Sequence, residues 1–171
     1  FQQAASEGNI RAMNELGLCY EAGRGVEKDI HRAAELYRQA AQSGMAAAQC
    51  NLGVLTLHGV GTEADPAAAA EWFRRAAEQS FARAQDLLGD CYLDGKGVEA
   101  DPARAAELYR QAADQGYPSA ISSLGLCYEI GSGVEQDPAR AVELYREAAR
   151  RGDAHASKAL KELEGRTAPD K

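Results

Sequence analysis

A period of 36 residues constrains the fold of this chain more than any other feature. The string RAAELYRQAA occurs at 32–41 and again at 104–113, a separation of 72 residues. Half of that separation brings the whole chain into register, with Leu-Gly pairs starting at positions 16, 52, 88 and 124 and Gly-x-Gly starting at 23, 59, 95 and 131. Four copies without a slip predict a stack of similar units rather than one central core.

Each unit is predicted to contain two helices. In the third unit, Ala84, Leu88 and Tyr92 form one stripe of a helix over 82–93, and Gly95 ends it because glycine adopts left-handed backbone easily. The second helix follows Asp-Pro at 101–102, where the aspartate caps free N–H groups and the proline takes the first helical position. The capping aspartate recurs at positions 29, 65 and 137.

Two further repeated features concern the helix surfaces. Gly89 removes a side chain at a point where we expect a neighbouring helix to approach. Glu107 and Arg110 are three residues apart on the exposed flank of the second helix, where an ion pair adds a few tenths of a kcal/mol. The same pair recurs at 35/38, 71/74 and 143/146.

The string A-x-x-x-L-G-x-C-Y-x-x-G-x-G-V-x-x-D, followed by A-x-E-L-Y-R-x-A-A and a closing glycine, resembles the Sel1-like repeat, a relative of the tetratricopeptide repeat. The resemblance covers nearly the whole chain. It implies an all-α fold, a right-handed superhelical solenoid of helix-turn-helix repeats with a concave and a convex side. The second unit departs from the pattern at Thr56, Thr62, Trp72-Phe73 and Ser80.

The repeat sets the predicted boundaries. They are the end of a preceding repeat at 1–8, full repeats at 9–44, 45–80, 81–116 and 117–152, a capping helix at 153–165 and a disordered tail at 166–171. Lys158, Lys161 and Glu162 suit the polar outer side of a capping helix. Because Phe1 begins inside a repeat, we expect further sequence upstream, which includes any targeting segment.

Charge and hydropathy exclude two classes of partner. A net charge of −7 argues against nucleic acid, because binding to a phosphate backbone depends on clustered Lys and Arg. No apolar run approaches the roughly 20 residues that cross a bilayer, and no charged-then-apolar leader precedes the repeats. We therefore expect neither a nucleic-acid nor a membrane partner.

The sequence offers little for a metal, a cofactor or catalysis. His31, His58 and His155 occupy three different registers of the repeat, and the cysteines form no C-x-x-C pair. The glycine pairs follow a helix rather than a strand, which argues against a phosphate loop. The resemblance adds that some secreted relatives have been proposed to act on cell-wall-like ligands. It leaves a weak cell-wall hydrolase as a remote alternative, for which Asp86, Asp90 and Asp94 are the only clustered acids. We predict a non-enzymatic protein without a cofactor.

The cysteines are predicted to be free and mostly buried. Cys19, Cys91 and Cys127 share a register in which the second unit has Leu55, which indicates an apolar slot. Equivalent atoms of adjacent repeats lie about 8–10 Å apart, beyond the roughly 7 Å Cα limit for a disulfide. The resemblance adds that some secreted relatives carry a disulfide within each repeat. This chain lacks the second cysteine, which favours the cytoplasm over a periplasmic or secreted location.

One stripe of the first helices varies between the copies, at i, i+3, i+7 and i+10. The resemblance implies that this face lines a concave groove that binds a peptide or partner protein, although a solvated face that drifts freely gives the same variation. The stripe comprises Arg11, Asn14, Leu18, Glu21, Ala47, Cys50, Val54, Leu57, Arg83, Asp86, Asp90, Leu93, Ser119, Ser122, Leu126 and Glu129.

The stripe also indicates the kind of partner. Val54, Leu57, Leu93 and Leu126 form an apolar track, and the acids beside it favour a peptide whose apolar anchors are flanked by basic residues. The sequence thus predicts a non-catalytic protein-interaction scaffold. The main alternative is a structural spacer or oligomerisation module within a larger protein.

Overall fold

The computed structural model describes residues 1–167, and every regular element in that part of the chain is an α-helix. The helices are α1 (Gln2–Ser6), α2 (Ile10–Ala22), α3 (Ile30–Gln42), α4 (Ala46–His58), α5 (Pro66–Ala77), α6 (Ala82–Asp94), α7 (Pro102–Asp114), α8 (Pro118–Ile130), α9 (Pro138–Arg150) and α10 (Ala154–Thr167).

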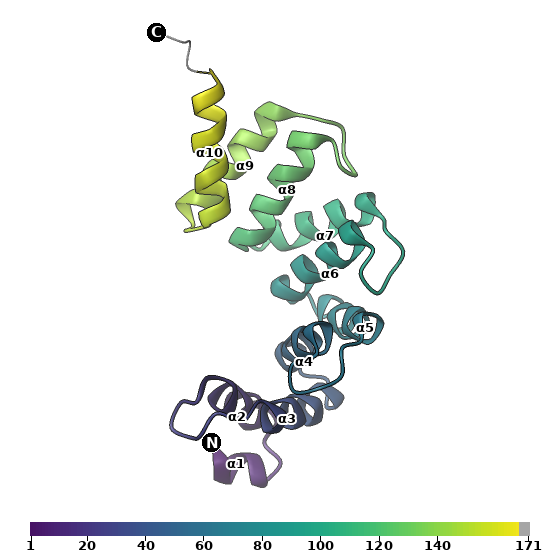
Figure 1. Ribbon diagram of the computed structural model, residues 1–171, viewed down its shortest axis with the longest axis vertical. Coiled ribbons are helices and arrows are strands. Elements are labelled where there is room, and N and C mark those ends of the chain that lie inside the picture. Colours follow the sequence, from purple (N-terminus) through teal and green to yellow (C-terminus); the bar gives the residue numbers. More distant parts are fainter. Residues whose placement is uncertain (168–171) are drawn as a thin grey trace.

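The helices stack in pairs along the chain. The pairs are α2/α3, α4/α5, α6/α7 and α8/α9, and the second helix of each pair packs against the first helix of the next. Figure 1 shows the pairs following one another in a curved stack, with α1 at one end and α10 at the other. Helix α1 packs on α2, and α10 packs on α9. The predicted all-α solenoid is confirmed.

The second helix of each pair begins where the capping aspartates predict. Asp29 Oδ1 accepts a hydrogen bond from the Arg32 backbone N–H at 3.0 Å, and Asp101 Oδ1 accepts one from the N–H of Arg104 at 3.0 Å. Asp65 and Asp137 do the same in their repeats. These four local bonds fix the start of each second helix independently of the rest of the stack.

The two glycines of each Gly-x-Gly have different roles. Gly95 ends α6 in left-handed backbone at φ 69°, as predicted. Gly97 is also left-handed, at φ 74°, but a Cβ added there would lie 2.0 Å from the carbonyl oxygen of Pro66. The loop of one repeat therefore rests on the start of the second helix of the preceding repeat. That close approach needs the second glycine.

An aromatic ring fills the space between the two helices of each pair. Tyr109 is 1% exposed and lies over Gly89, where an added Cβ would meet the tyrosine Cε1 at 2.6 Å. Gly89 therefore does make room for a neighbouring helix. The predicted stripe of Ala84, Leu88 and Tyr92 is buried in the core.

The irregular second repeat has a cavity at two of its exchanged positions. Thr56 is smaller than the tyrosine of the other repeats, and Trp72 is larger than their leucine; both line a cavity of about 490 Å³. Ser80 adopts left-handed backbone at φ 59°, in the register where the third repeat has Gly116 at φ 79°. The backbone path is thus kept although the glycine is replaced.

The ends of the chain follow the repeat as well. Ala5 in α1 is buried, as Ala41 is in the matching register of α3. At the other end, Asp153 caps α10 by accepting a hydrogen bond from the N–H of Ala156 at 2.7 Å, and Lys158 is exposed. Helix α10 runs to Thr167, two residues into the predicted tail, and positions 168–171 of that tail lie outside the described residues.

Candidate functional site

The first helices of successive repeats form one continuous surface, which we call the first-helix face and which contains the variable stripe predicted above. Asn51 of α4 donates a hydrogen bond from Nδ2 to Asn14 Oδ1 of α2 at 3.2 Å. Arg83 of α6 donates from Nη1 to Asn51 Oδ1 at 3.1 Å. A chain of polar contacts thus connects three neighbouring first helices, so residues of the predicted stripe lie side by side.

The four positions of the stripe differ in exposure. Arg11, Arg83 and Ser119 are exposed and Ala47 is half-buried. The next position is closed in every repeat, with Asn14 3%, Cys50 0%, Asp86 5% and Ser122 8% exposed. These four residues form the floor between neighbouring helices, so they do not offer an open surface.

The apolar side chains of the stripe differ in how exposed they are. Val54, Leu57 and Leu93 are half-buried and pack against the core, whereas Leu126 is 44% exposed. Ile130, one turn beyond Leu126, is 61% exposed and was not part of the predicted stripe. The sequence could have indicated Ile130, because it lies four residues after Leu126 and therefore on the same side of the helix.

Buried tyrosines hold three of the acids on this face. Tyr37 Oη donates to Glu21 Oε2 at 2.6 Å, and Tyr145 Oη donates to Glu129 Oε2 at 2.7 Å. Burial, followed by the hydrogen bond to the acid, raises the pKa of both phenols well above the usual range. These hydroxyl groups therefore remain protonated and available as donors.

The third repeat makes the same bond from a different position. Tyr109 Oη donates to Asp90 Oδ1 at 2.7 Å, and Asp90 lies one turn before the register of Glu21 and Glu129. The second repeat has Phe73 in place of the tyrosine and no acid at either position. The repeats that have the tyrosine thus also have an acid that accepts its hydrogen bond, and the repeat that lacks the tyrosine lacks the acid. This correlation is visible in the sequence, but the sequence analysis did not use it.

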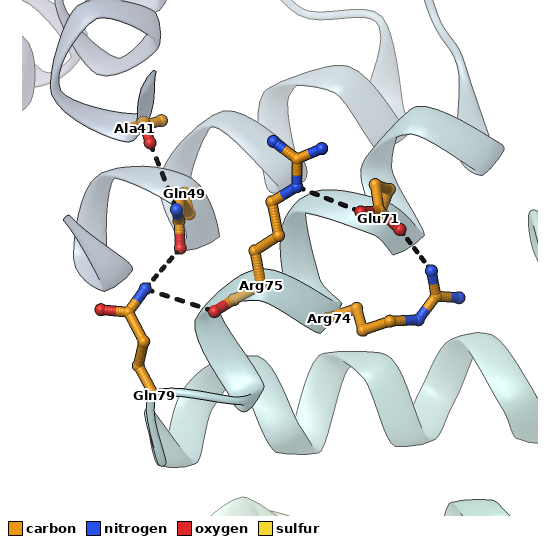
Figure 2. A network of polar contacts seen from close by, with 6 residues as sticks. All are labelled: Ala41, Gln49, Glu71, Arg74, Arg75 and Gln79. Carbon is orange, nitrogen blue, oxygen red and sulfur yellow. Dashed lines mark hydrogen bonds and ion pairs between the residues drawn. The ribbon is translucent and has the colours of Figure 1, made fainter. Parts of the chain in front are cut away.

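Glutamine pairs give a second set of unpredicted contacts. Gln79 donates from Nε2 to Gln49 Oε1 at 2.9 Å, and Gln49 donates to the carbonyl of Ala41 in the preceding repeat at 3.2 Å (Figure 2). In the third repeat, Gln115 donates to Gln85 Oε1 at 2.7 Å. In the second and third repeats, these amide pairs join the first helix to the end of the second helix of the same repeat, and Gln49 also contacts the end of the second helix of the preceding repeat.

The predicted Glu/Arg pairs are confirmed in two repeats. Glu71 contacts Arg74, and also Arg75, as Figure 2 shows, and Glu107 Oε2 lies 2.8 Å from Arg110 Nη1. The prediction is wrong in the fourth repeat, where Glu143 pairs with Arg140 at 2.7 Å instead of Arg146. Among the described residues, Glu35 and Arg38 form no ion pair. On an exposed flank, such alternatives differ little in energy.

Asp86 is the most perturbed acid of the first-helix face. Burial, followed by the nearby charges of Asp90 and Asp153, raises its pKa to about 7, against a hydrogen bond with Ser119 that lowers it. Within residues 1–167, its Oδ1 has no hydrogen-bond partner. Asp90 differs because it accepts the tyrosine bond, although burial raises its pKa as well.

A cavity of about 420 Å³ lies at the C-terminal end of this face, between α8 and α10. Ser119, Ser122 and Leu126 of the stripe line it from α8. Asp153, His155 and Lys158 line it from the opposite side. The cavity is therefore lined by both polar and apolar groups, among them the exposed side chain of Leu126.

Comparison with known proteins identifies the repeat. The Sel1 repeat family matches residues 10–45, 46–81, 82–117 and 118–153. The chain belongs to the Sel1 repeat family. Sel1 repeat proteins are generally protein-interaction scaffolds, and the family is generally non-catalytic.

Solved structures share the architecture of this Sel1 repeat chain. It is 39% identical to c5321, a protective antigen of uropathogenic Escherichia coli with an SLR fold, and 39% identical to a Sel1 repeat protein of Oxalobacter formigenes, with TM-scores of 0.87 and 0.89. The matches cover 95% and 93% of this chain but 35% and 63% of those chains. None of the curated proteins matches it.

A more distant structure shows the fold alone. The cysteine-rich protein B of Helicobacter pylori is 23% identical over 77% of this Sel1 repeat chain and 98% of its own, with a TM-score of 0.61.

In the present chain Cys50, Cys91 and Cys127 are buried and Cys19 is half-buried, in line with the predicted slots. Burial raises the pKa of Cys50 and Cys91 to about 11, so these thiols stay protonated.

The histidines and clustered acids that the sequence analysis considered for a metal or catalytic site do not come together in one place. The three histidines lie on α3, α4 and α10. Across the described residues, no group of three or more His, Cys, Asp or Glu side chains could hold a metal ion. Of the acids considered for hydrolysis, Asp94 pairs with Lys96 at 2.6 Å and Asp90 binds a tyrosine. In the same part of the chain, no helix is both long and apolar enough to span a bilayer.

Proposed function

We propose that this Sel1 repeat chain is a non-catalytic interaction scaffold whose first-helix face binds a peptide or a segment of a partner protein. The observation that carries the proposal is the contrast between fixed and variable positions. Leu88 and Gly89, which recur in all four repeats, and Tyr109, which recurs in three, are buried in the packing of the stack. The variable residues share one continuous face, and several of them are exposed or half-buried.

The chemistry of the face supports a particular kind of peptide. Leu126 is exposed, and Leu57 and Leu93 are half-buried, so an apolar side chain could cover them and gain burial. Glu21 and Glu129 each accept one hydrogen bond from a tyrosine, which leaves further acceptor sites on each carboxylate. A peptide with apolar anchors flanked by basic residues matches both features.

The relatives favour a second candidate. The chain spans about a third of one similar structure and under two thirds of another. A repeat segment within a larger protein can act as a spacer or an oligomerisation module, with the exposed pair Leu126 and Ile130 meeting a second copy. Sedimentation of the parent and of Leu126→Lys separates this candidate from peptide binding, because a self-association surface gives a concentration-dependent mass that the substitution removes.

The test of the proposed function is retention of proteins from a lysate of the source organism. The parent is compared with Leu126→Lys and with a matched control, Val60→Lys, since Val60 is 43% exposed in the loop after α4 and lies off the first-helix face. We expect a protein, identified by mass spectrometry, that the parent and the control retain and Leu126→Lys does not. Equal retention by all three folded proteins contradicts the proposal.

A further inference from the structure

Asp86 occupies a position that is neutral in every other repeat. The equivalent residues are Asn14, Cys50 and Ser122, all buried in the floor of the first-helix face. Asn14 has a partner, because its Oδ1 accepts from Asn51. Asp86 is only 5% exposed, yet its Oδ1 lacks a partner among the described residues. Burying a carboxyl group in this way is unfavourable, so the position calls for a specific explanation.

The basic side chains near Asp86 are engaged elsewhere. Arg83, one turn earlier on α6, directs its guanidinium to Asn51 at 3.1 Å. Lys96 pairs with Asp94 at 2.6 Å. No basic group is among the causes that shift the pKa of Asp86.

The groups that face Asp86 are acidic or neutral. Asp90 faces it from α6 itself, Ser119 from α8, and Asp153 from the turn before α10. Tyr109 of α7 and Tyr117, at the start of α8, lie close enough to feel the charge of Asp86. Within residues 1–167, these groups form an acidic corner that contains no basic side chain. Lys158, which lines the adjoining cavity, pairs with Glu162 at 3.8 Å.

The corner adjoins the cavity between α8 and α10. Ser119 is exposed, and Ser119 and Asp153 both line the cavity, which has a volume of about 420 Å³. Leu126 forms part of the same wall. A side chain that enters the cavity therefore meets Asp153 and an exposed leucine, together with His155 and Lys158. Asp86 and Asp90 are not part of the lining, and Asp86 is connected to the cavity through Ser119, to which it is hydrogen-bonded.

We propose that the corner formed by Asp86, Asp90 and Asp153 receives an arginine or lysine side chain of the bound peptide, while an apolar residue of that peptide covers Leu126. This inference rests on the proposed function and names the chemistry of one anchor. An ammonium or guanidinium group supplies the donors that Asp86 lacks, and bonds between charged groups are the stronger kind. Asp90 keeps its bond to Tyr109 through Oδ1 and accepts from the cation through its other oxygen.

The experiment begins with selection of random displayed peptides on three immobilised proteins. These are the parent, Asp86→Asn, and the control Asp114→Asn, which removes one exposed acid at the end of α7. Asn occurs naturally at the equivalent position 14 and keeps the size of the side chain. We expect the parent and the control to select peptides with an arginine or lysine beside an apolar residue, and Asp86→Asn to lose that preference.

One selected peptide then serves as a synthetic, fluorescently labelled probe, with a second version in which citrulline replaces the arginine. Citrulline keeps the shape of the side chain without its charge. We expect the arginine peptide to bind Asp86→Asn at least about tenfold more weakly than the parent, and the citrulline peptide to bind both proteins equally.

The contrary outcomes separate the two proposals. Selected peptides without a basic preference, or an arginine peptide that binds Asp86→Asn as well as the parent, overturn the assignment of the acidic corner and leave the proposed function standing. Peptides that bind Leu126→Lys as well as the parent place binding off the first-helix face and overturn both. If the parent selects no peptide, both proposals fail together.

Discussion

The carboxyl group of Asp86 lies where the other repeats place asparagine, cysteine and serine. In the unfolded chain its pKa is near 3.8, and in the folded protein burial and the charge of Asp90 raise it to about 7. Between these two values the unfolded chain has released a proton that the folded chain still holds. Stability therefore falls as the pH rises through this window, and the full penalty applies above about pH 7.

Replacement of Asp86 by Asn removes this penalty. We expect Asp86→Asn to unfold with a free energy higher than that of the parent by about 1–4 kcal/mol at pH 8, and by little or nothing near pH 3. Denaturant unfolding of both proteins at a series of pH values measures the difference, with Asp114→Asn as the control for the loss of one surface charge. A difference that does not change with pH contradicts the account.

At the scale of helices, the best predicted features were those set by local sequence. The caps at Asp29 and Asp101 and the stop at Gly95 depend on a few neighbouring residues, so the pattern was enough to place them. Contacts between helices of different repeats could not be predicted from the local sequence pattern. That Gly97 rests on Pro66 of the preceding repeat depends on how the units stack, which periodicity alone does not specify.

The same limit applies to the candidate site. The stripe of the first helices was chosen for its variation, and variation does not separate an exposed position from the floor between two helices, where Cys50 and Asp86 lie. The glutamine pairs and the tyrosine bonds join positions on two different helices. Finding them required the repeats to be compared for paired changes, such as Phe73 together with Val54, rather than one position at a time.

The bond between the two helices of a pair can be transferred to the second repeat. Val54 and Phe73 correspond to Asp90 and Tyr109 of the third repeat, which are joined at 2.7 Å. We expect Phe73→Tyr alone to destabilise the protein because it buries a hydroxyl group without its partner. Val54→Asp alone should destabilise it because it replaces a half-buried apolar contact with the core by a charged group. The double variant should recover about 1 kcal/mol relative to the sum of the two, as measured by a double-mutant cycle in denaturant. Strict additivity contradicts the proposed role of the bond.

The contact between a loop and the preceding repeat allows a matched comparison. Gly97 and Gly25 both adopt left-handed backbone, at φ 74° and 72°, but a Cβ at Gly25 meets nothing within 4 Å, whereas one at Gly97 meets the backbone of Pro66. Gly25→Ala should cost about 1–2 kcal/mol of backbone strain. Gly97→Ala should cost a further 1–3 kcal/mol, roughly, for the steric conflict. Equal changes in thermal or denaturant stability would contradict this packing.

At the scale of the whole molecule, each helix pair contacts the pairs beside it, and the stack has no single centre. In this architecture, different residues stabilise the stack and form the exposed surface. The buried residues that recur in every repeat hold neighbours together, and the first helices align their remaining side chains along one face, joined by the chain of contacts from Asn14 through Asn51 to Arg83. A surface built in this way can vary from repeat to repeat without loss of the fold.

We propose that binding takes place on the first-helix face. This proposal is tested most directly by a titration of the isotopically labelled protein with a selected peptide, followed by the backbone amide shifts in NMR spectra. We expect shifts concentrated in α2, α4, α6 and α8 and at the start of α10, with α3, α5, α7 and α9 changed little. Shifts concentrated in that second set of helices would contradict it.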